Sequence, residues 1–326
     1  MNPGFCRITT KEGLVMLEVG LLTLKNVGIL LIFMLLGYIL YHSGKFPVEA
    51  PKVISTLTTT LFLPAYTISS LAQNFTPDKI GQQAALLGYG VIFIFAAIGL
   101  GLLLSKLLGK DPYDRHSLAY AFTFPNYGYF GYPVIAGVFG AQTLADVMIF
   151  TIPTAIACQT YGYILFSPEK KINWKKVFMT PSILAVFIGS AIGLSGIRLP
   201  AFCIDVLDTA GGCMSPASML LGGFLLGKFP IKSLLSSFRA YLLSTIRMLG
   251  IPLVFGLVLY FLGLREQYFL FPLLIVTLPL GLNLVVFPES YGLEEVATGN
   301  ARICFVSYLL ALILLPLSFA LITYLA

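Results

Sequence analysis

Charged residues are scarce in this chain. Asp, Glu, Lys and Arg make up only 10% of its 326 residues, whereas a soluble globular domain carries about 25%. Hydrophobic residues make up 58%, which is more than a soluble domain of this length can bury. The composition therefore excludes a soluble domain and predicts an integral membrane protein whose helices pack together in lipid.

Residues that bind metals or perform catalysis are also few. The two histidines, His42 and His116, are too few for a metal site, and no pair of cysteines has Cys-x-x-Cys spacing. The five cysteines are Cys6, Cys158, Cys203, Cys213 and Cys304. No paired Asp, Ser/Lys or His-rich motif lies within an apolar segment, and no basic patch is interleaved with aromatic residues. We therefore expect no enzyme activity, no metal or other cofactor, and no nucleic-acid partner.

Long apolar segments, by contrast, are abundant. A spanning helix needs about 20 mostly apolar residues, and ten such segments follow a polar N-terminal lead-in, residues 1–21. They lie near residues 22–42, 53–73, 84–108, 116–140, 144–166, 181–198, 202–227, 238–263, 268–291 and 296–325. The chain is therefore predicted to be all-α, with ten transmembrane helices.

Positive charges alternate between the loops that join these segments. Loops after the odd-numbered segments carry twelve Lys and Arg residues, and loops after even-numbered segments carry three. The twelve are Lys45, Lys52, Lys106, Lys110, Arg115, Lys170, Lys171, Lys175, Lys176, Lys228, Lys232 and Arg239; the three are Lys79, Arg198 and Arg265. Because cytoplasmic loops are enriched in Lys and Arg, both termini are predicted to lie on the non-cytoplasmic side of the plasma (inner) membrane.

The two halves of the chain share a pattern of Gly and Pro. The pairs Gly37 and Gly189, Gly44 and Gly196, Pro64 and Pro216, and Gly140 and Gly292 are each 152 residues apart. This favours two five-helix repeats, 22–167 and 181–326, joined by a cytoplasmic loop at 168–180. An odd number of helices inverts the second repeat relative to the first. The alternative is the general richness of membrane helices in glycine.

The fourth segment contains residues that disfavour an unbroken helix. The stretch FTFPNYGYFGYPVIAGVFG carries Pro125, Gly128, Gly131 and Pro133, which predict two half-helices with extended backbone between them. Free backbone groups at that depth must face protein or a wet cavity. A half-helix N-terminus carries partial positive charge and unpaired N–H donors, and the Asn126 amide adds another donor. This arrangement suits a carboxylate.

The ninth segment carries a matching set: Pro279, Gly281, Asn283 and Pro288. We therefore predict a second broken helix that crosses the first, so that helices 4 and 9 form the binding site. Paired interrupted helices in inverted repeats are typical of secondary transporters. The alternative is a pair of proline kinks that serve packing alone.

Each of the remaining polar candidates has a functional and a structural interpretation. Ser182 and Ser215 lie beside prolines near the start of the sixth and within the seventh segment, and either lines the site or packs. Tyr127 either stacks on a substrate or packs. Glu289 is a candidate for carrying a coupling proton or cation, or a surface carboxylate. Arg302 either balances the substrate's charge or lies at an interface.

The stretch PNYGYFGYPV, followed by Gly140, resembles the Asn-x-Gly-x-x-Gly-x-Pro crossover of the auxin efflux carrier family. The similarity continues through SGIRLP, SPASMLLGGFLLG, GIPLVFGLVLYFLGL and LPLGLNLVVFPESYG. That family includes plant PIN-FORMED carriers and bacterial malate or malonate carriers, and its fold is similar to that of bile-acid/sodium symporters. The chain departs from the family at Leu280, which follows Pro279 in place of a polar residue, and in its short loop between Ser167 and Thr180.

The resemblance implies a scaffold of spans 1, 2, 6 and 7 and a moving transport domain of spans 3–5 and 8–10. We therefore expect an elevator-type secondary carrier of small organic anions, such as auxin-like compounds or mono- and dicarboxylates. The alternative is a sodium-coupled organic-anion symporter of the bile-acid type. Besides its substrate, the protein's partner is the lipid bilayer; coupling to protons or Na⁺ and formation of a homodimer are left open.

Overall fold

The computed structural model describes residues 10–47, 49–169, 171–172 and 174–326. Apart from one isolated β-bridge, the regular structure in these residues is helical, which confirms the predicted all-α class. The α-helices are α1 Thr10–His42, α2 Ala50–Leu57, α3 Leu63–Asn74, α4 Ile80–Leu108, α5 Pro112–Thr123, α6 Tyr132–Phe150, α7 Ile152–Ala157, α8 Tyr163–Phe166, α9 Trp174–Phe178, α10 Pro181–Ser195, α11 Ala201–Gly212, α12 Met214–Gly227, α13 Ile231–Leu235, α14 Phe238–Thr245, α15 Ile251–Phe261, α16 Gln267–Val276, α17 Asn283–Ser290 and α18 Glu294–Leu325. Short π-helical turns join several of them: η1 Thr58–Phe62, η3 Tyr127–Gly131, η4 Cys158–Gly162 and η5 Ile246–Gly250; η2 Pro77–Lys79 is a 3₁₀ turn.

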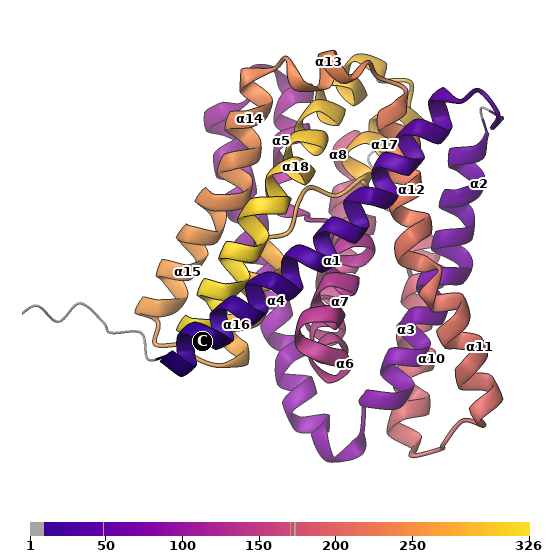
Figure 1. Ribbon diagram of the computed structural model, residues 1–326, viewed down its shortest axis with the longest axis vertical. Coiled ribbons are helices and arrows are strands. Elements are labelled where there is room, and N and C mark those ends of the chain that lie inside the picture. Colours follow the sequence, from indigo (N-terminus) through magenta and orange to yellow (C-terminus); the bar gives the residue numbers. More distant parts are fainter. Residues whose placement is uncertain (1–9, 48, 170, 173) are drawn as a thin grey trace, which may run out of the picture.

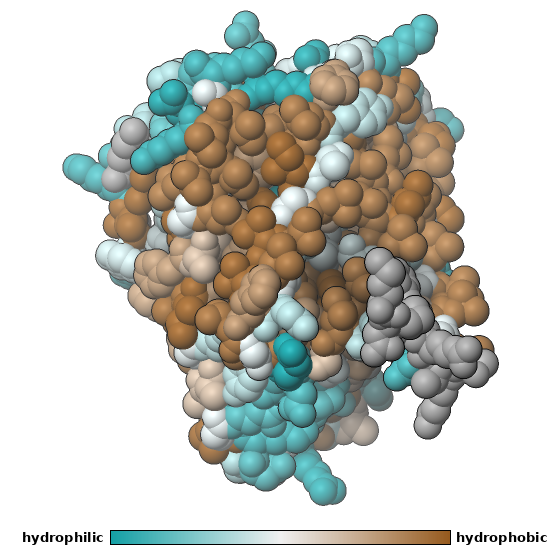
Figure 2. All heavy atoms as spheres, turned by 90° about the vertical axis from the view of Figure 1, so that its left-hand side faces the viewer, coloured by the Kyte–Doolittle hydropathy of each residue, from teal (hydrophilic) through white to brown (hydrophobic). Residues whose placement is uncertain are grey.

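Six helical stretches within the described residues are long and apolar enough to cross a membrane. They are Glu12–His42, Pro77–Leu108, Tyr127–Phe150, Ala201–Gly227, Phe238–Phe261 and Glu294–Leu325. Large hydrophobic side chains are exposed along them, and Figure 2 shows a broad hydrophobic belt between two hydrophilic ends. Such a belt would be unstable in water and fits the apolar interior of a bilayer.

The helix boundaries differ from the predicted segments at the start of the chain and between the fourth and fifth segments. The first helix begins at Thr10, well before residue 22, so much of the expected lead-in is helical; residues 1–9 lie outside the described part. Helix α6 runs from Tyr132 to Phe150 across the predicted gap between the fourth and fifth segments, with non-helical backbone at Gly140. The ninth segment is divided into α16 and α17, as predicted for a second broken helix, because the chain leaves the helix after Val276. Composition places apolar runs well, but helix ends depend on contacts that composition does not contain.

The helices form two groups (Figure 1). Helices α2, α3, α10, α11 and α12 lie together on the right of the view, and α4, α5, α14, α15, α16 and α18 lie on the left. Helix α1 runs diagonally across both groups and packs against α12, α18 and α6. The group on the right is held by α10 and α11 packing on α3, and the group on the left by α4 on α5 and α14 on α18.

Helices α1 and α12 approach each other closely through glycine. A β-carbon added at Gly223 in α12 would overlap the backbone oxygen of Met34 in α1, and one added at Gly37 would overlap the backbone oxygen of Leu220. Small residues permit such close packing in lipid, where van der Waals contact is a main source of helix association.

We expect Gly223→Ala to destabilise the protein by about 1–3 kcal/mol, because the added methyl group must separate the two backbones. The matched control is Gly28→Ala on α1, where nothing lies within 4 Å of the added carbon and alanine favours the helix. Melting temperatures of both variants in one detergent would measure the difference. Equal melting temperatures would contradict the proposed close contact.

Candidate functional site

Two breaks in the helices touch each other at the centre of the protein. Helix α5 ends at Thr123, residues 124–126 are not helical, and α16 ends at Val276 with helix resuming only at Asn283. Pro125 and Leu280 form an antiparallel β-bridge, and the backbone N–H of Asn126 donates to the Pro279 oxygen at 2.8 Å. The two broken segments therefore meet through their backbones.

The extended part of the first break is shorter than the sequence suggested. Only residues 124–126 leave the helix, whereas Gly128 and Gly131 lie in the π-helical turn η3. This turn is closed by a hydrogen bond from the Gly131 N–H to the Asn126 oxygen at 2.9 Å. A wider π turn accommodates the missing N–H of Pro133, so the chain needs no longer extended stretch.

Side chains from other helices satisfy backbone groups that the breaks release. Pro133 cannot donate to the Tyr129 oxygen one turn earlier, and this oxygen accepts a hydrogen bond from Ser218 Oγ of α12 at 3.3 Å. The Leu280 N–H donates to Ser307 Oγ of α18 at 3.2 Å. Non-helical backbone is thus tolerated here because its polar groups have partners.

Asn126 is held at the crossing by one side-chain contact. Its side chain is buried, with only 4% exposed, and its Nδ2 donates to the Tyr308 hydroxyl of α18 at 2.6 Å. An amide has two N–H donors and one carbonyl acceptor. The contact with Tyr308 therefore fixes the orientation of Asn126 and uses one of its two donors.

A cavity of about 980 Å³ lies against the crossing. Its lining includes residues of α3 and α10, of α4 and α7, and of the two breaks. Seven of the candidate residues line it: Pro125, Asn126, Tyr127, Gly128, Ser182, Gly281 and Asn283. Residues from both halves of the sequence thus share one cavity.

Four other candidate residues do not line the cavity. Gly131 packs against Leu278, since a β-carbon there would overlap that side chain. Pro133 lies in the first turn of α6, and Pro279 offers its oxygen to Asn126. The backbone oxygen of Ser215 accepts a hydrogen bond from Ser218 Oγ at 2.9 Å. Gly131, Pro133 and Pro279 therefore contribute to the structure of the crossing, and Ser215 to that of α12.

The cavity wall is aromatic and uncharged. Tyr120, Tyr127, Tyr129, Tyr132 and Tyr161 all line it, and none of the described lining residues is Asp, Glu, Lys, Arg or His. A ligand would therefore meet apolar surface with a few hydroxyl and amide groups, which is the usual composition of a small-molecule pocket.

Some of the polar side chains of the cavity wall already have hydrogen-bond partners within the protein. The Tyr120 hydroxyl lies 3.3 Å from Cys158 Sγ, and Asn283 interacts with both groups. The Tyr132 hydroxyl lies 2.7 Å from Thr151 Oγ1. The Tyr161 hydroxyl is buried and has no hydrogen-bond partner among the described residues, so it is available to a ligand.

Glu289 and Arg302, the candidates for coupling, lie away from this cavity. Glu289 at the end of α17 forms an ion pair with Lys228 after α12, and both side chains are about one-third exposed. Arg302 of α18 donates through Nη2 to Ser233 Oγ of α13 at 3.0 Å.

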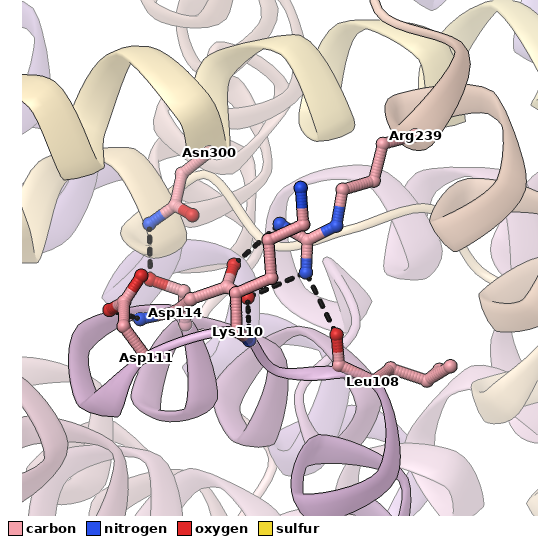
Figure 3. Close-up of polar contacts among 7 residues, drawn as sticks. Leu108, Lys110, Asp111, Asp114, Arg239 and Asn300 are labelled. Atoms are coloured by element: carbon pink, nitrogen blue, oxygen red, sulfur yellow. Dashed lines mark hydrogen bonds and ion pairs between the residues drawn. The ribbon is translucent and has the colours of Figure 1, made fainter.

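Arg302 instead lines a second, polar cavity of about 600 Å³. Figure 3 shows the contacts there: Arg239 Nη1 donates to Asp114 Oδ1 at 2.9 Å, and its Nη2 donates to the Leu108 oxygen at 3.0 Å. Asp114 precedes the predicted fourth span. Burial alone would raise its pKa, but the effect of the Arg239 guanidinium is larger than that of burial, so the pKa of Asp114 lies below its usual range. Asn300 donates to Ser117 Oγ at 3.1 Å. These contacts tie α5, the half-helix that leads to the crossing, to α14 and α18.

Sequence reasoning missed the residues that support the crossing from other helices: Ser218, Ser307 and Tyr308. Each is an ordinary polar residue within an apolar helix, and its partner lies far away in sequence. No local signal marks such a residue.

Comparison with known protein families defines the class of this protein. Residues 22–175 and 169–319 match the family described as membrane transport protein, which makes the chain a multi-pass membrane transporter and not an enzyme. The chain belongs to this family, the auxin efflux carrier family, and the match confirms the resemblance found in the crossover motif.

Two archaeal proteins are similar to the chain along most of their length. An uncharacterized transporter of Methanothermobacter thermautotrophicus is 24% identical over 292 residues, covering 88% of this chain and 94% of that protein. The uncharacterized transporter MJ1031 of Methanocaldococcus jannaschii is 23% identical over 216 residues, covering 63% of this chain and 69% of that protein.

Proposed function

We propose that this protein is a secondary carrier of small organic anions that holds the substrate carboxylate at the helix crossing. The observation that carries the proposal is the position of Asn126, which lies in the first break where it meets the second and lines a large uncharged cavity. Its second amide N–H and the N-terminal end of the η3–α6 segment supply donors for a carboxylate without a buried formal charge in the wall.

The shape and chemistry of the cavity favour certain anions. Its tyrosine-rich wall suits an apolar or aromatic body, and its hydroxyl and amide groups suit a second polar end. We therefore place auxin-like acids and short mono- or dicarboxylates first among substrates. Tyr127, Ser182, Gly281 and Asn283 are the proposed contacts besides Asn126, since they line the same cavity.

Ten spans in two inverted repeats are part of the proposal. Its support is the backbone conformation of paired glycines. Gly44 and Gly196 both have positive φ, 66° and 68°, and Gly140 and Gly292 both have positive φ, 85° and 71°. Chance occurrence of glycine would not give both members of two pairs the same unusual conformation.

We further propose elevator-type alternating access. Spans 1, 2, 6 and 7 correspond to α1, α2–α3, α10 and α11–α12, and would form the scaffold. Helices α4–α8 and α14–α18 would move. The support is that α3 and α10 of the scaffold and α4, α7 and the crossing of the moving part all line one cavity, because a substrate held there can be carried past the scaffold.

Uptake into proteoliposomes tests the function. Labelled indole acetate and a panel of mono- and dicarboxylates would be offered with and without Na⁺ and pH gradients. Saturable uptake of at least one organic anion, reduced by an excess of the unlabelled compound, is the expected result. Uptake only in the presence of Na⁺ would instead favour the bile-acid type of symporter, and no uptake of any anion would reject the carrier proposal.

The proposed topology places both termini outside the cytoplasm, and it predicts a labelling pattern. In a variant without native cysteines, Asp78→Cys should react with an impermeant thiol reagent added to intact cells, because Asp78 lies on the proposed outer face. Ser236→Cys, on the opposite end, should react only after the cells are opened. Both positions are exposed, so burial cannot explain a difference. The reverse pattern would invert the topology.

A further inference from the structure

Arg247 is a buried arginine within the apolar stretch Phe238–Phe261, and the proposed function makes no use of it. It lies in the π-helical turn η5 between α14 and α15, and its side chain is completely buried. A charged side chain inside a membrane segment is costly and faces protein or a cavity. Arg247 does not line the substrate cavity among the described residues, so its role lies in the protein interior.

The partner of Arg247 is the end of a broken helix. Its Nη1 donates to the backbone oxygen of Val276 at 2.8 Å, and Val276 is the last residue of α16. A helix C-terminus carries partial negative charge and unpaired carbonyls. The Arg247 Nε and Nη2 atoms have no hydrogen-bond partner among the described residues, and the two ion pairs found there join other residues. Within the described part of the chain, the guanidinium is therefore bonded to one carbonyl of this helix end and forms no ion pair with a carboxylate.

This contact places a fixed positive charge at the base of the crossing. Only Thr277 and Leu278 separate Val276 from Pro279, whose oxygen accepts the Asn126 N–H. In carriers with broken helices, the carbonyls of the unwound segment and the C-terminal ends of half-helices coordinate the coupling cation.

We propose that Arg247 is a built-in cation of the helix crossing and takes the place at the end of α16 that a coupling Na⁺ occupies in sodium-driven carriers. The inference rests on the proposed carrier function. It has two consequences: the crossing needs no added Na⁺ to be stable, and its permanent positive charge favours an anionic substrate over a neutral one.

Binding of Na⁺ itself tests this without any substrate. Purified wild-type protein is expected to melt at the same temperature in NaCl and in choline chloride of equal concentration. Arg247→Met removes the charge and exposes the carbonyls, so NaCl should raise its melting temperature over choline chloride by about 2 °C or more. Arg247→Lys keeps a cation and should behave like the wild type. Radioactive sodium should bind saturably to Arg247→Met and not to the wild type or to Arg247→Lys.

Arg247→Gln is the second variant, because its amide can still donate to the Val276 oxygen and preserves folding where methionine does not. It should gain the same dependence on Na⁺. If both neutral variants are less stable but melt at the same temperature in NaCl and in choline chloride, Arg247 serves only to hold the helices together and the proposal is wrong. Saturable Na⁺ binding to the wild type would also overturn it, even if neither neutral variant folds. Because no organic anion is present, these outcomes are independent of whether the carrier proposal holds.

Discussion

Asn126→Asp is expected to weaken binding of the organic anion more than a hundredfold near neutral pH. Aspartate is nearly the same size as asparagine, but it places a negative charge against the substrate carboxylate in a cavity whose described wall has no charged residue to offset it. Asn126→Ala should cost about 1.5–3 kcal/mol, the usual value of a hydrogen bond to a charged group, or roughly ten- to a hundredfold. The expected order of affinity is therefore wild type, Ala, Asp.

Substrate affinity and melting temperature of both variants, purified in parallel, would measure this. Tyr308→Phe is the matched control, because it removes the contact that orients Asn126 and leaves the amide in place. It should cost only about 0.5–1.5 kcal/mol. If Asn126→Asp binds the anion as tightly as the wild type, the carboxylate is not held at Asn126. A packing role alone would lower the melting temperature and leave the affinity of folded protein unchanged.

Gly128→Leu is expected to reduce uptake to background without unfolding the protein. Gly128 lines the cavity, and nothing lies within 4 Å of the place where a β-carbon would stand. A leucine side chain would therefore extend into the space that the substrate needs, whereas the helix tolerates leucine well.

The matched control is Gly88→Leu on α4. Gly88 also has nothing within 4 Å of its added carbon, but it is exposed on the outer surface and does not line the cavity. Uptake by this variant should remain close to that of the wild type. Initial rates in proteoliposomes, corrected for the amount of folded protein, decide the matter. Normal uptake by Gly128→Leu would mean that the substrate path lies elsewhere.

The breaks in the helices were predictable because their cause is local. Proline lacks an N–H wherever it stands, and glycine adopts unusual backbone conformations wherever it stands, so Pro125 and Pro279 predicted the two interruptions from sequence alone. The extent of the first interruption was not predictable. It depends on η3, whose π turn is stabilised by Ser218 from a helix of the other half.

The supporting residues of the site differ in how visible they are. Tyr308 and Ser307 become meaningful only through contacts with Asn126 and Leu280, and nothing in the surrounding sequence indicates these contacts. Arg247 did carry a signal, since a single arginine in an apolar run is unusual, but a count of loop charges passes over it.

The crossing also sets the order in which the protein can be completed during synthesis. Asn126 and its partner Tyr308 are 182 residues apart. A ribosome that adds about 5–20 residues per second needs roughly 10–40 s to make the intervening chain. Until then the first break lacks Pro279, Leu280 and Tyr308, and unpaired backbone groups facing lipid cost several kcal/mol each. The binding site therefore cannot be completed before the last helix, α18, has been synthesised as far as Tyr308.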